Sequence, residues 1–266
     1  MPPSDYPAPP RRRIVGVSTK MYFSAARTTS YVSSVLSLLS SPDVSPDLSN
    51  IDIFIIPDHL TLSNVVSQVQ SAPSPLARSV LVGAQHCYLE DSGAFTGEVS
   101  PSVLKEVGCG IVELGHAERR RLFGETDEST AAKAKAVVRN GMVPLICVGE
   151  VMKGEVETAT EEVMMQVRSV LEAVGEDAEV VLAYEPVWAI GQAEPAGCEY
   201  VCGVVRRVRE SREVKGRKGG VRIVYGGSAG PGLFERLKGE ADGLFLGRFA
   251  HEAEGFLKTL EEVAGA

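Results

Sequence analysis

Three side chains with complementary proton chemistry each follow a short apolar run of the sequence. Lys20 comes after IVGVS, His116 after IVELG and Glu185 after VVLAY. A carboxylate can take a proton, an imidazole can donate one, and an ammonium group can stabilise negative charge that develops during a reaction. Together, these groups would suit the transfer of a proton on a carbon next to a carbonyl group.

Two glycine-containing segments near the end of the sequence could bind a phosphate group. YGGSAG contains Gly227 and Ser228, and LGR contains Gly247 and Arg248. Glycine allows backbone N–H groups to approach an anion closely. Taken alone, GGS fits an ordinary tight turn as well as a phosphate site, so its place in the fold must decide between them.

The apolar segment PVWAIG, directly after Glu185, is expected to be a loop. Pro186 opposes continuation of a helix or strand, and Gly191 ends the segment. An apolar loop beside a carboxylate suggests a lid that closes over a site. Closure would exclude water, protect a reactive intermediate and raise the basicity of Glu185 by desolvation.

These residues can act together only if the elements between them place them side by side. Short apolar runs rich in β-branched residues recur about every 33 residues, which suits one strand and one helix per unit. The runs are IVGVS, IDIFII, VLVGA, IVELG, VPLICV, VVLAY, VRIVY and GLFLG, beginning at Ile14, Ile51, Val80, Ile111, Val143, Val180, Val221 and Gly243. Mostly apolar strands bracketed by helices indicate a parallel sheet covered on both faces.

Helices are expected between these runs, among them segments 101–107, 127–139, 155–174 and 198–214. No linker divides residues 14–266, which we interpret as one catalytic domain. Residues 1–13 are rich in proline and arginine and are expected to form a disordered tail. Eight consecutive βα units in one domain of this length predict an α/β fold, a single closed (β/α)8 barrel.

A parallel barrel gathers its functional residues at the C-terminal ends of its strands. Lys20, His116 and Glu185 would then share one mouth. Phosphate sites of such barrels commonly follow the last two strands, which is where Ser228 and Gly247 fall. The predicted fold therefore brings a proton-transfer site and a phosphate site together.

The composition excludes several classes of partner. The net charge of −8 argues against a surface for nucleic acid or an anionic membrane. No run approaches the roughly 18 apolar residues of a transmembrane helix, and no secretory signal is evident, so a cytoplasmic protein is expected. Five cysteines form no C-x-x-C pair and are expected to be reduced. Cys198 and Cys202 share a helix face, but without a nearby histidine packing outweighs a metal site.

The segments AYEPVWAIG, LGHAERR, GAFTGE, CVGE and YGGS together resemble the triosephosphate isomerase family, from Ile14 to about Phe256. The resemblance implies that Glu185 moves a proton between adjacent carbons and that His116 polarises the carbonyl group. It also implies that Lys20 holds the developing charge and that Glu118 pairs with Lys20 and orients it.

The same resemblance implies a ligand site, an assembly and the absence of a cofactor. Gly191, Ser228, Gly247 and neighbouring backbone, including Gly227, would bind the substrate's phosphate group. The GAFTGE segment, from Gly93 to Glu98, is similar to a projecting loop that inserts into a second subunit, which implies a homodimer. No metal ion or organic cofactor is expected.

Several positions depart from the family pattern. The first loop reads STKMY at 18–22 instead of Asn-Trp-Lys-Met-Asn, and the lid ends in GQAEP at 191–195 instead of Gly-Thr-Gly-Lys. Ala117 replaces a serine of the family pattern, and His86 replaces an asparagine. The histidines His59, His86 and His251 are interpreted as structural or peripheral, with His86 nearest the mouth. The proton-transfer residues are kept, while the surroundings that select the substrate are altered.

Two of the altered positions would face the substrate. Ser18 puts a short hydroxyl group where the family has an amide, which makes the site roomier. Arg248 takes the place of the second glycine of a phosphate-binding pair, where it could clamp a phosphate group or contact an extra hydroxyl group of a longer substrate. A surface role for Arg248 is the alternative.

These observations predict an aldose–ketose isomerase of short phosphosugars that works through an enediol intermediate. The leading substrate pair is dihydroxyacetone phosphate and glyceraldehyde 3-phosphate, and the alternative is a four-carbon erythrulose phosphate. A third hypothesis is a barrel that binds a phosphosugar or a protein without turnover. Taken singly, Glu185 could be a strand-end cap, Lys20 a surface charge and His116 a helix-entry residue, but the combined motifs favour catalysis.

Overall fold

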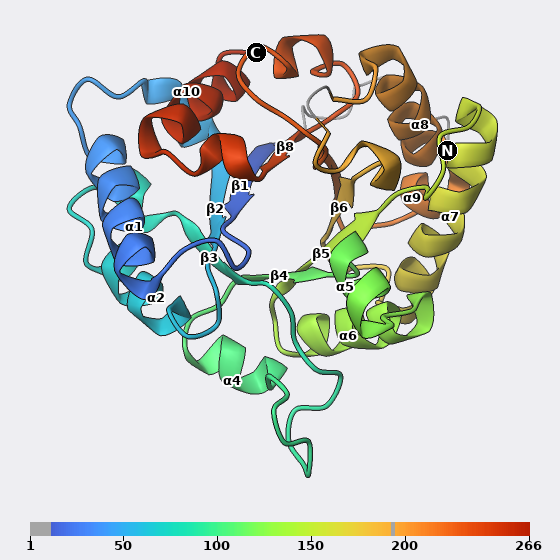
Figure 1. Cartoon of the computed structure of the whole chain (residues 1–266), viewed down its shortest axis with the longest axis horizontal. Coiled ribbons are helices and arrows are strands. Elements are labelled where there is room, and N and C mark those ends of the chain that lie inside the picture. Colours follow the sequence, from blue (N-terminus) through green and yellow to red (C-terminus); the bar gives the residue numbers. More distant parts are fainter. Residues whose placement is uncertain (1–11, 193–194) are drawn as a thin grey trace, which may run out of the picture.

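Eight parallel strands close into a barrel at the centre of the molecule (Figure 1). The computed structural model describes residues 12–192 and 195–266. The strands follow one another around the barrel in chain order, and β8 pairs with β1 to close it. They are β1 (Arg13–Ser18), β2 (Ile51–Ile56), β3 (Leu81–Ala84), β4 (Ile111–Leu114), β5 (Val143–Val148), β6 (Val180–Tyr184), β7 (Val221–Tyr225) and β8 (Gly243–Leu246).

Helices surround the barrel on its outer side (Figure 1). They are α1 (Ala25–Leu39), α2 (Leu62–Gln70), α3 (Pro75–Arg78), α4 (Pro101–Glu106), α5 (Ala117–Phe123), α6 (Asp127–Arg139), α7 (Val156–Ala173), α8 (Cys198–Glu210), α9 (Arg212–Lys215) and α10 (Ala253–Ala264). Short 3-10 turns lie at η1 (Pro46–Asn50), η2 (Val187–Ala189), η3 (Phe234–Arg236) and η4 (Arg248–Ala250). The predicted (β/α)8 barrel is confirmed.

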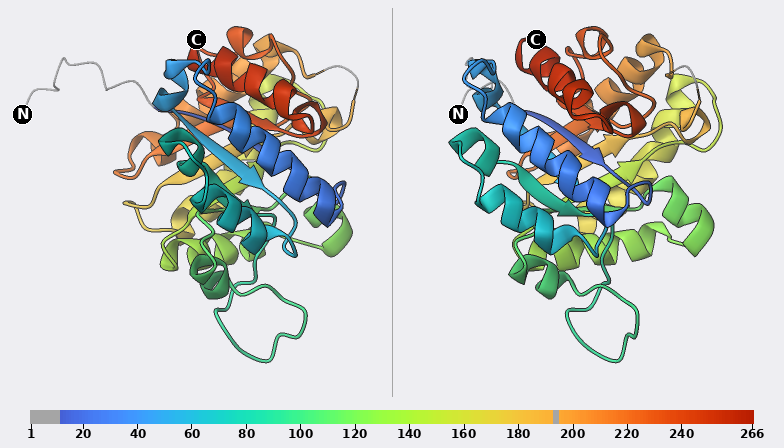
Figure 2. Two further views of the ribbon diagram at one scale, coloured as in Figure 1. Left: turned by 90° about the vertical axis from the view of Figure 1, so that its left-hand side faces the viewer. Right: turned by 60° about the vertical axis from the view of Figure 1, so that its left-hand side comes forward.

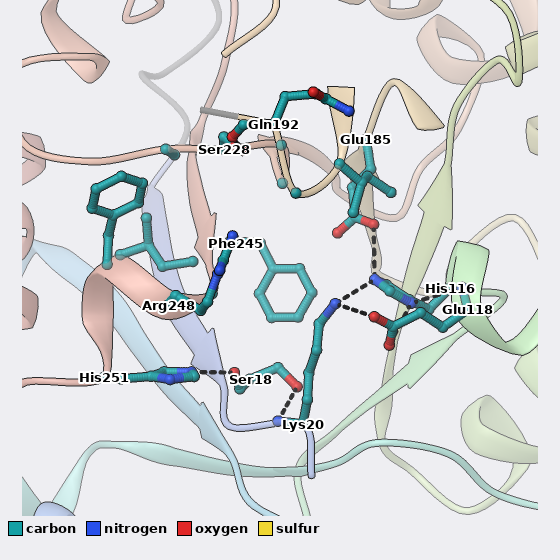
Figure 3. A pocket seen from close by; sticks show the side chains of 18 of the residues that line it. Ser18, Lys20, His116, Glu118, Glu185, Gln192, Ser228, Phe245, Arg248 and His251 are labelled. Atoms are coloured by element: carbon teal, nitrogen blue, oxygen red, sulfur yellow. Dashed lines mark hydrogen bonds and ion pairs between the residues drawn. The ribbon is translucent and has the colours of Figure 1, made fainter. Parts of the chain in front are cut away.

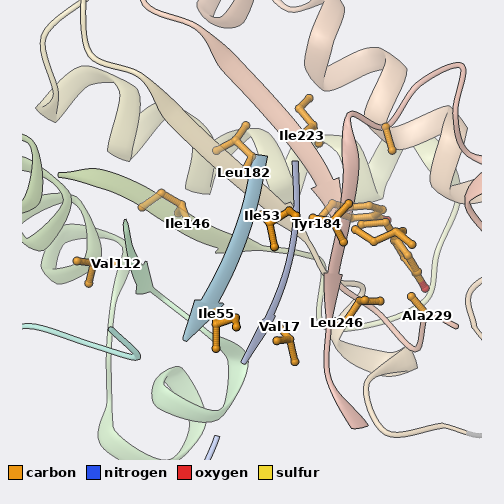
Figure 4. Packing of buried hydrophobic residues seen from close by; sticks show 14 of the residues in the cluster. Val17, Ile53, Ile55, Val112, Ile146, Leu182, Tyr184, Ile223, Ala229 and Leu246 are labelled. Atoms are coloured by element: carbon orange, nitrogen blue, oxygen red, sulfur yellow. The ribbon is translucent and has the colours of Figure 1, made fainter. Parts of the chain in front are cut away.

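Alternation along each strand divides the apolar residues into two packed layers. Residues such as Val17, Ile53 and Leu246 point outward and pack beneath the helices, as Figure 4 shows for part of this layer. The alternate residues, including Ile14, Phe54 and Phe245, fill the inside of the barrel. Because the side-chain direction alternates, every second strand residue near the C-terminal end points into the mouth.

The expected strands agree with the observed ones to within about a residue, and helix 127–139 matches α6. The expected helix 198–214 is wrong in one respect, because it divides into α8 and α9. Ser211 is extended, and its side chain accepts a hydrogen bond from the backbone of Val214, so it begins a new helical turn. β1 begins at Arg13, one residue earlier than expected.

Two further predictions concern the ends and the surface of the chain. Residues 1–11 of the predicted tail lie outside the described residues. In the described part of the chain, no helix is both long enough and apolar enough to cross a membrane. The segment between β3 and α4, which includes GAFTGE, projects away from the barrel as a single long loop (Figure 2).

Candidate active site

One cavity of about 530 Å³ opens at the C-terminal ends of the strands, and the side chains around it are drawn in Figure 3. All of the residues that the sequence singles out for catalysis or binding line it: Ser18, Lys20, His116, Glu118, Glu185, Gly191, Gly227, Ser228, Gly247 and Arg248. The structure thus brings these residues together, and their individual roles stay predictions.

Lys20 lies just beyond β1, between a carboxylate and an imidazole. Its Nζ is 2.9 Å from Oε1 of Glu118 and 3.4 Å from Nε2 of His116. The backbone φ angle of Lys20 is 46°, in the left-handed region. Among the residues that the structure describes, no other non-glycine residue has a positive φ, and this conformation costs free energy. Burial by itself would lower the pKa of Lys20. The hydrogen bond to Glu118 and the negative charges of Glu185 and Glu113 have the opposite and larger effect, so the pKa of Lys20 is raised overall. Lys20 is therefore a fixed positive charge.

His116 is the residue that caps the N-terminus of α5. The backbone N–H of Glu118 donates a hydrogen bond to Nδ1 of His116 over 3.1 Å. Because Nδ1 accepts, the proton of the neutral ring must be on Nε2, which faces Lys20 and Glu185 (Figure 3). Burial, aided by the charge of Lys20, lowers the pKa of His116 to about 4. The ring is thus a neutral donor near neutral pH.

Glu185 follows β6 and is almost completely buried, at 4% exposure. Burial raises its pKa to about 8, with Lys20 opposing and Glu113 adding to the rise. Its Oε2 is 3.3 Å from Nε2 of His116, yet the two are not aligned as a hydrogen bond. A Cβ at Gly226 would lie 2.5 Å from Oε1 of Glu185, so a glycine is needed there. The carboxyl group is held as a strong base with one free oxygen.

The segment after Glu185 is anchored by a second buried carboxylate, Glu150. Three side chains donate to it: the hydroxyl of Tyr184 over 3.1 Å, Nε1 of Trp188 over 2.7 Å and the hydroxyl of Tyr200 over 2.9 Å. Trp188 belongs to η2, so Glu150 ties the predicted lid to β6 and α8. Sequence reasoning did not identify Glu150, because its partners are 34 to 50 residues away along the chain.

The other side of the cavity carries the predicted phosphate-binding residues. The Ser228 hydroxyl donates to the backbone oxygen of Gln192 over 3.0 Å, which joins the lid segment to the loop after β7. Arg248 lies on η4, across the cavity from Lys20 and Glu185 (Figure 3). The lid departures at Ala193 and Glu194 lie outside the described residues. This side offers exposed backbone and a guanidinium group to an anion.

The histidines differ in their relation to the cavity. His251, interpreted from the sequence as peripheral, lines the cavity, and its Nε2 lies 3.3 Å from the backbone oxygen of Ser18. The sequence signal that could have placed His251 at the cavity is its position three residues after Arg248, in the same loop. His86 is buried in a network with Glu125 and Glu98 and does not line the cavity. That interpretation of His86 as structural agrees with its contacts.

Taken together, the cavity holds a buried base, a neutral proton donor and a fixed cation on one side. Its other side suits a phosphate group. Within residues 12–192 and 195–266, no three His, Cys, Asp or Glu side chains are placed to hold a metal ion. The arrangement is suited to moving a proton between neighbouring carbons of a phosphorylated hydroxycarbonyl compound.

A family model described as triosephosphate isomerase matches residues 13–263 of the chain. The chain is 41% identical over 255 residues to an L-erythrulose-1-phosphate isomerase of Pectobacterium atrosepticum, covering 95% of this chain and 96% of the relative. It is 41% identical to the protein of that name from Rhizobium etli (86% and 85% covered) and 39% identical to that from Rhizobium meliloti (95% and 97%).

The chain therefore belongs to the triosephosphate isomerase family. It is an enzyme, an isomerase of phosphosugars. These comparisons support the enzymatic interpretation over the alternative of a barrel that binds without turnover.

The contacts of Glu150 predict the effect of removing it. Glu150→Ala should leave three buried donors without an acceptor and lower the free energy of unfolding by about 3 kcal/mol or more. Amide hydrogen exchange in residues 187–192 should accelerate, as measured by mass spectrometry. Glu162→Ala, which removes an acceptor for the exposed backbone of Val151, is the control and should change neither property appreciably. Unchanged exchange in Glu150→Ala would show that Glu150 does not hold the lid.

Proposed function

We propose that this enzyme acts on a four-carbon substrate, an erythrulose phosphate, instead of a triose phosphate. The observation that carries the proposal is the name shared by its relatives at 39–41% identity, L-erythrulose-1-phosphate isomerase. The triose pair, which the sequence analysis placed first, gives way to the four-carbon alternative. The short Ser18 hydroxyl and the Arg248 side chain at the cavity are consistent with a longer substrate.

In this proposal the phosphate group lies near Ser228 and Gly247, and the sugar carbons point toward Glu185. Glu185 removes the proton from C3 of an erythrulose 1-phosphate, and Nε2–H of His116 donates to the oxygen on C2. Lys20 stabilises the negative charge of the resulting enediolate. The neutral ring of His116 suits this role because it has a proton to give without carrying a charge of its own.

The reaction is completed by returning the proton one carbon away. Glu185 gives its proton to C2, while the proton of the C3 hydroxyl group is transferred to the oxygen on C2 by way of His116. The carbonyl group has then moved from C2 to C3, and no atom is gained or lost. On a triose phosphate the same steps join a ketone to an aldehyde, whereas on an erythrulose 1-phosphate both isomers are ketoses, the product being an erythrulose 4-phosphate.

Substrate preference is tested by measuring kcat/KM side by side for L-erythrulose 1-phosphate and glyceraldehyde 3-phosphate. We expect the four-carbon compound to be preferred by a factor on the order of 10 to 10², the usual effect of one substrate carbon on selectivity. Preference for the triose would restore the first hypothesis. Failure to turn over either compound would contradict the proposed function as a whole.

The role of Glu185 is tested by Glu185→Gln, which keeps the shape of the side chain but cannot take a proton. We expect kcat to fall by a factor on the order of 10² to 10⁴. In the unaltered enzyme, kcat/KM should decrease as the pH falls below the pKa of about 8, because the base becomes protonated. Unchanged turnover in the variant would remove Glu185 from the mechanism.

Arg248 is proposed to contact the phosphate group or the additional hydroxyl group of the substrate. Arg248→Gly should lower kcat/KM for the erythrulose phosphate by about tenfold or more, as the loss of a charge-assisted hydrogen bond would do. Arg248→Lys keeps the positive charge without the paired N–H groups and should recover part of the loss. Equal kcat/KM for all three proteins with every active phosphosugar would place Arg248 outside the substrate site.

A homodimer is the proposed assembly, formed through the loop from Gly93 to Glu98. The loop projects from the barrel and carries Phe95, which is 39% exposed. Met21, which follows Lys20 in the chain, is a second exposed apolar side chain, at 94% exposure. Sedimentation velocity of dilute protein should give twice the 28.4 kDa of one chain, and Phe95→Asp should shift it toward the monomer. Val151→Asp, at another exposed apolar position, is the control. A monomer of full activity would contradict the proposal.

A further inference from the structure

A carboxyl group that the mechanism above does not use lies inside the barrel, close to the site. Glu113 is the third residue of β4 and is 4% exposed. Its neighbours Val112 and Leu114 pack in the outer layer and Ile111 in the inner layer, so by alternation Glu113 points into the barrel. Its Oε2 is buried and has no hydrogen-bond partner among the described residues. A buried, unpartnered carboxyl oxygen is costly and calls for an explanation.

The groups that face Glu113 come from all the elements around the mouth. The Ser18 hydroxyl group, at the end of β1, acts on the Glu113 carboxyl group and lowers its pKa. The charged and titratable neighbours are Lys20 beyond β1, Glu118 and Arg119 on α5, Cys147 on β5 and Glu185 after β6. Glu113 does not line the cavity itself, whereas Ser18 and Glu185 both do. It can therefore influence the substrate only through those neighbours.

The cations near Glu113 are already engaged by other carboxylates. Lys20 is 2.9 Å from Glu118, and Nε of Arg119 is 3.1 Å from Oε1 of Glu125. An ionised Glu113 would thus share Lys20 with Glu118 and Glu185. Burying such a poorly paired charge is unfavourable, and burial raises the pKa of Glu113 to about 7, against the lowering effects of Lys20 and Ser18.

We propose that Glu113 is a positioning residue of the isomerase, which orients the Ser18 hydroxyl group at the floor of the cavity and opposes ionisation of Glu185. This inference rests on the proposed function, in which Glu185 is the base. Two buried carboxyl groups around one shared ammonium group cannot both ionise easily, so each makes the other a stronger base. A stronger base removes a carbon-bound proton more readily.

The state of Glu113 also determines what Ser18 offers to the substrate. As a carboxylic acid, Glu113 can donate its proton to Oγ of Ser18, which leaves the Ser18 hydrogen free for a substrate oxygen. As a carboxylate, Glu113 only accepts, and it takes the Ser18 hydrogen for itself. Ionisation of Glu113 therefore removes a donor from the cavity floor.

The activity test is the pH profile of kcat/KM for the erythrulose phosphate in Glu113→Gln. The amide keeps the shape and can still donate to Ser18, but it never carries a charge. The acidic limb of the profile should move to lower pH by on the order of one unit, because the like charge that opposes ionisation of Glu185 is gone. Asp52→Asn changes a carboxylate to an amide at the N-terminal end of β2, where Asp52 pairs with Arg222, and is the matched control. It should leave the limb in place.

A second variant separates the two actions of Glu113 and guards against misfolding of the first. Glu113→Asp keeps a titrating carboxyl group but withdraws it from Ser18. Below a pH of about 7, where a protonated Glu113 leaves the Ser18 hydrogen free for the substrate, KM should therefore rise, while the acidic limb stays near that of the unaltered enzyme. A purely structural Glu113 would give lower stability in both variants and the same limb in all proteins. That result would overturn the proposal.

A measurement without substrate distinguishes failure of this inference from failure of the proposed function. Infrared difference spectra of Glu185→Gln should show the carbonyl band of one protonated buried carboxyl group, which disappears as the pH rises through about 7. The band should be absent from the Glu113→Gln, Glu185→Gln double variant. Its absence from Glu185→Gln would overturn the inference even if the enzyme isomerises the sugar. Its presence in an enzyme inactive on every phosphosugar would contradict the proposed function alone.

Discussion

The electrostatics of the barrel mouth depend on one partly buried ammonium group, that of Lys20. It bonds to Glu118 at 2.9 Å and faces two further carboxyl groups, Glu185 and Glu113, which burial would otherwise keep neutral. The same charge helps to lower the pKa of His116, so that the ring stays a neutral donor. Because one cation acts on all of these groups, its placement adjusts the proton affinity that burial gives to each of them.

The position of Lys20 costs conformational free energy, and the fold maintains it. Lys20 adopts a left-handed backbone conformation, and the surrounding barrel must supply the free energy that this costs. Closure of β8 onto β1 fixes the end of β1, and the contact of His251 with the backbone of Ser18 connects it to the loop beyond β8. The apolar layers inside and outside the barrel thus hold the strand ends where proton transfer needs them.

The sequence was sufficient to predict the barrel and the residues around its cavity, since both follow from local signals. Apolar β-branched runs mark the strands, and the polar residues that follow them fall at the mouth. It was not sufficient where the meaning of a residue depends on distant partners. Glu150 gains its role from aromatic donors far along the chain, and His251 from the return of β8 to β1.

Glu113 illustrates the same limit in a different way. It stands within the apolar run IVELG, which was interpreted only as a strand. The strand period alone implies that its side chain shares a direction with that of Ile111, toward the inside of the barrel. The alternation along a strand cannot show that Glu113 lies near Ser18 and Glu185, because Ser18 belongs to β1 and Glu185 follows β6, on other parts of the barrel wall. The proposed substrate, likewise, rests on the names of the relatives and not on the catalytic residues, because proton transfer is common to three- and four-carbon sugars.

The central claim is that Glu185 moves a proton between two adjacent carbons through an enediolate. Its most direct test is proton NMR of L-erythrulose 1-phosphate incubated with the enzyme in deuterium oxide. The account predicts deuterium at C3 of the erythrulose 4-phosphate product, which is the carbon that was C2 of the substrate, and at C3 of the recovered substrate. Neither terminal carbon should carry deuterium, because only the proton on Glu185 exchanges with solvent. Product formed with no deuterium at C3 would indicate a hydride shift and contradict the account.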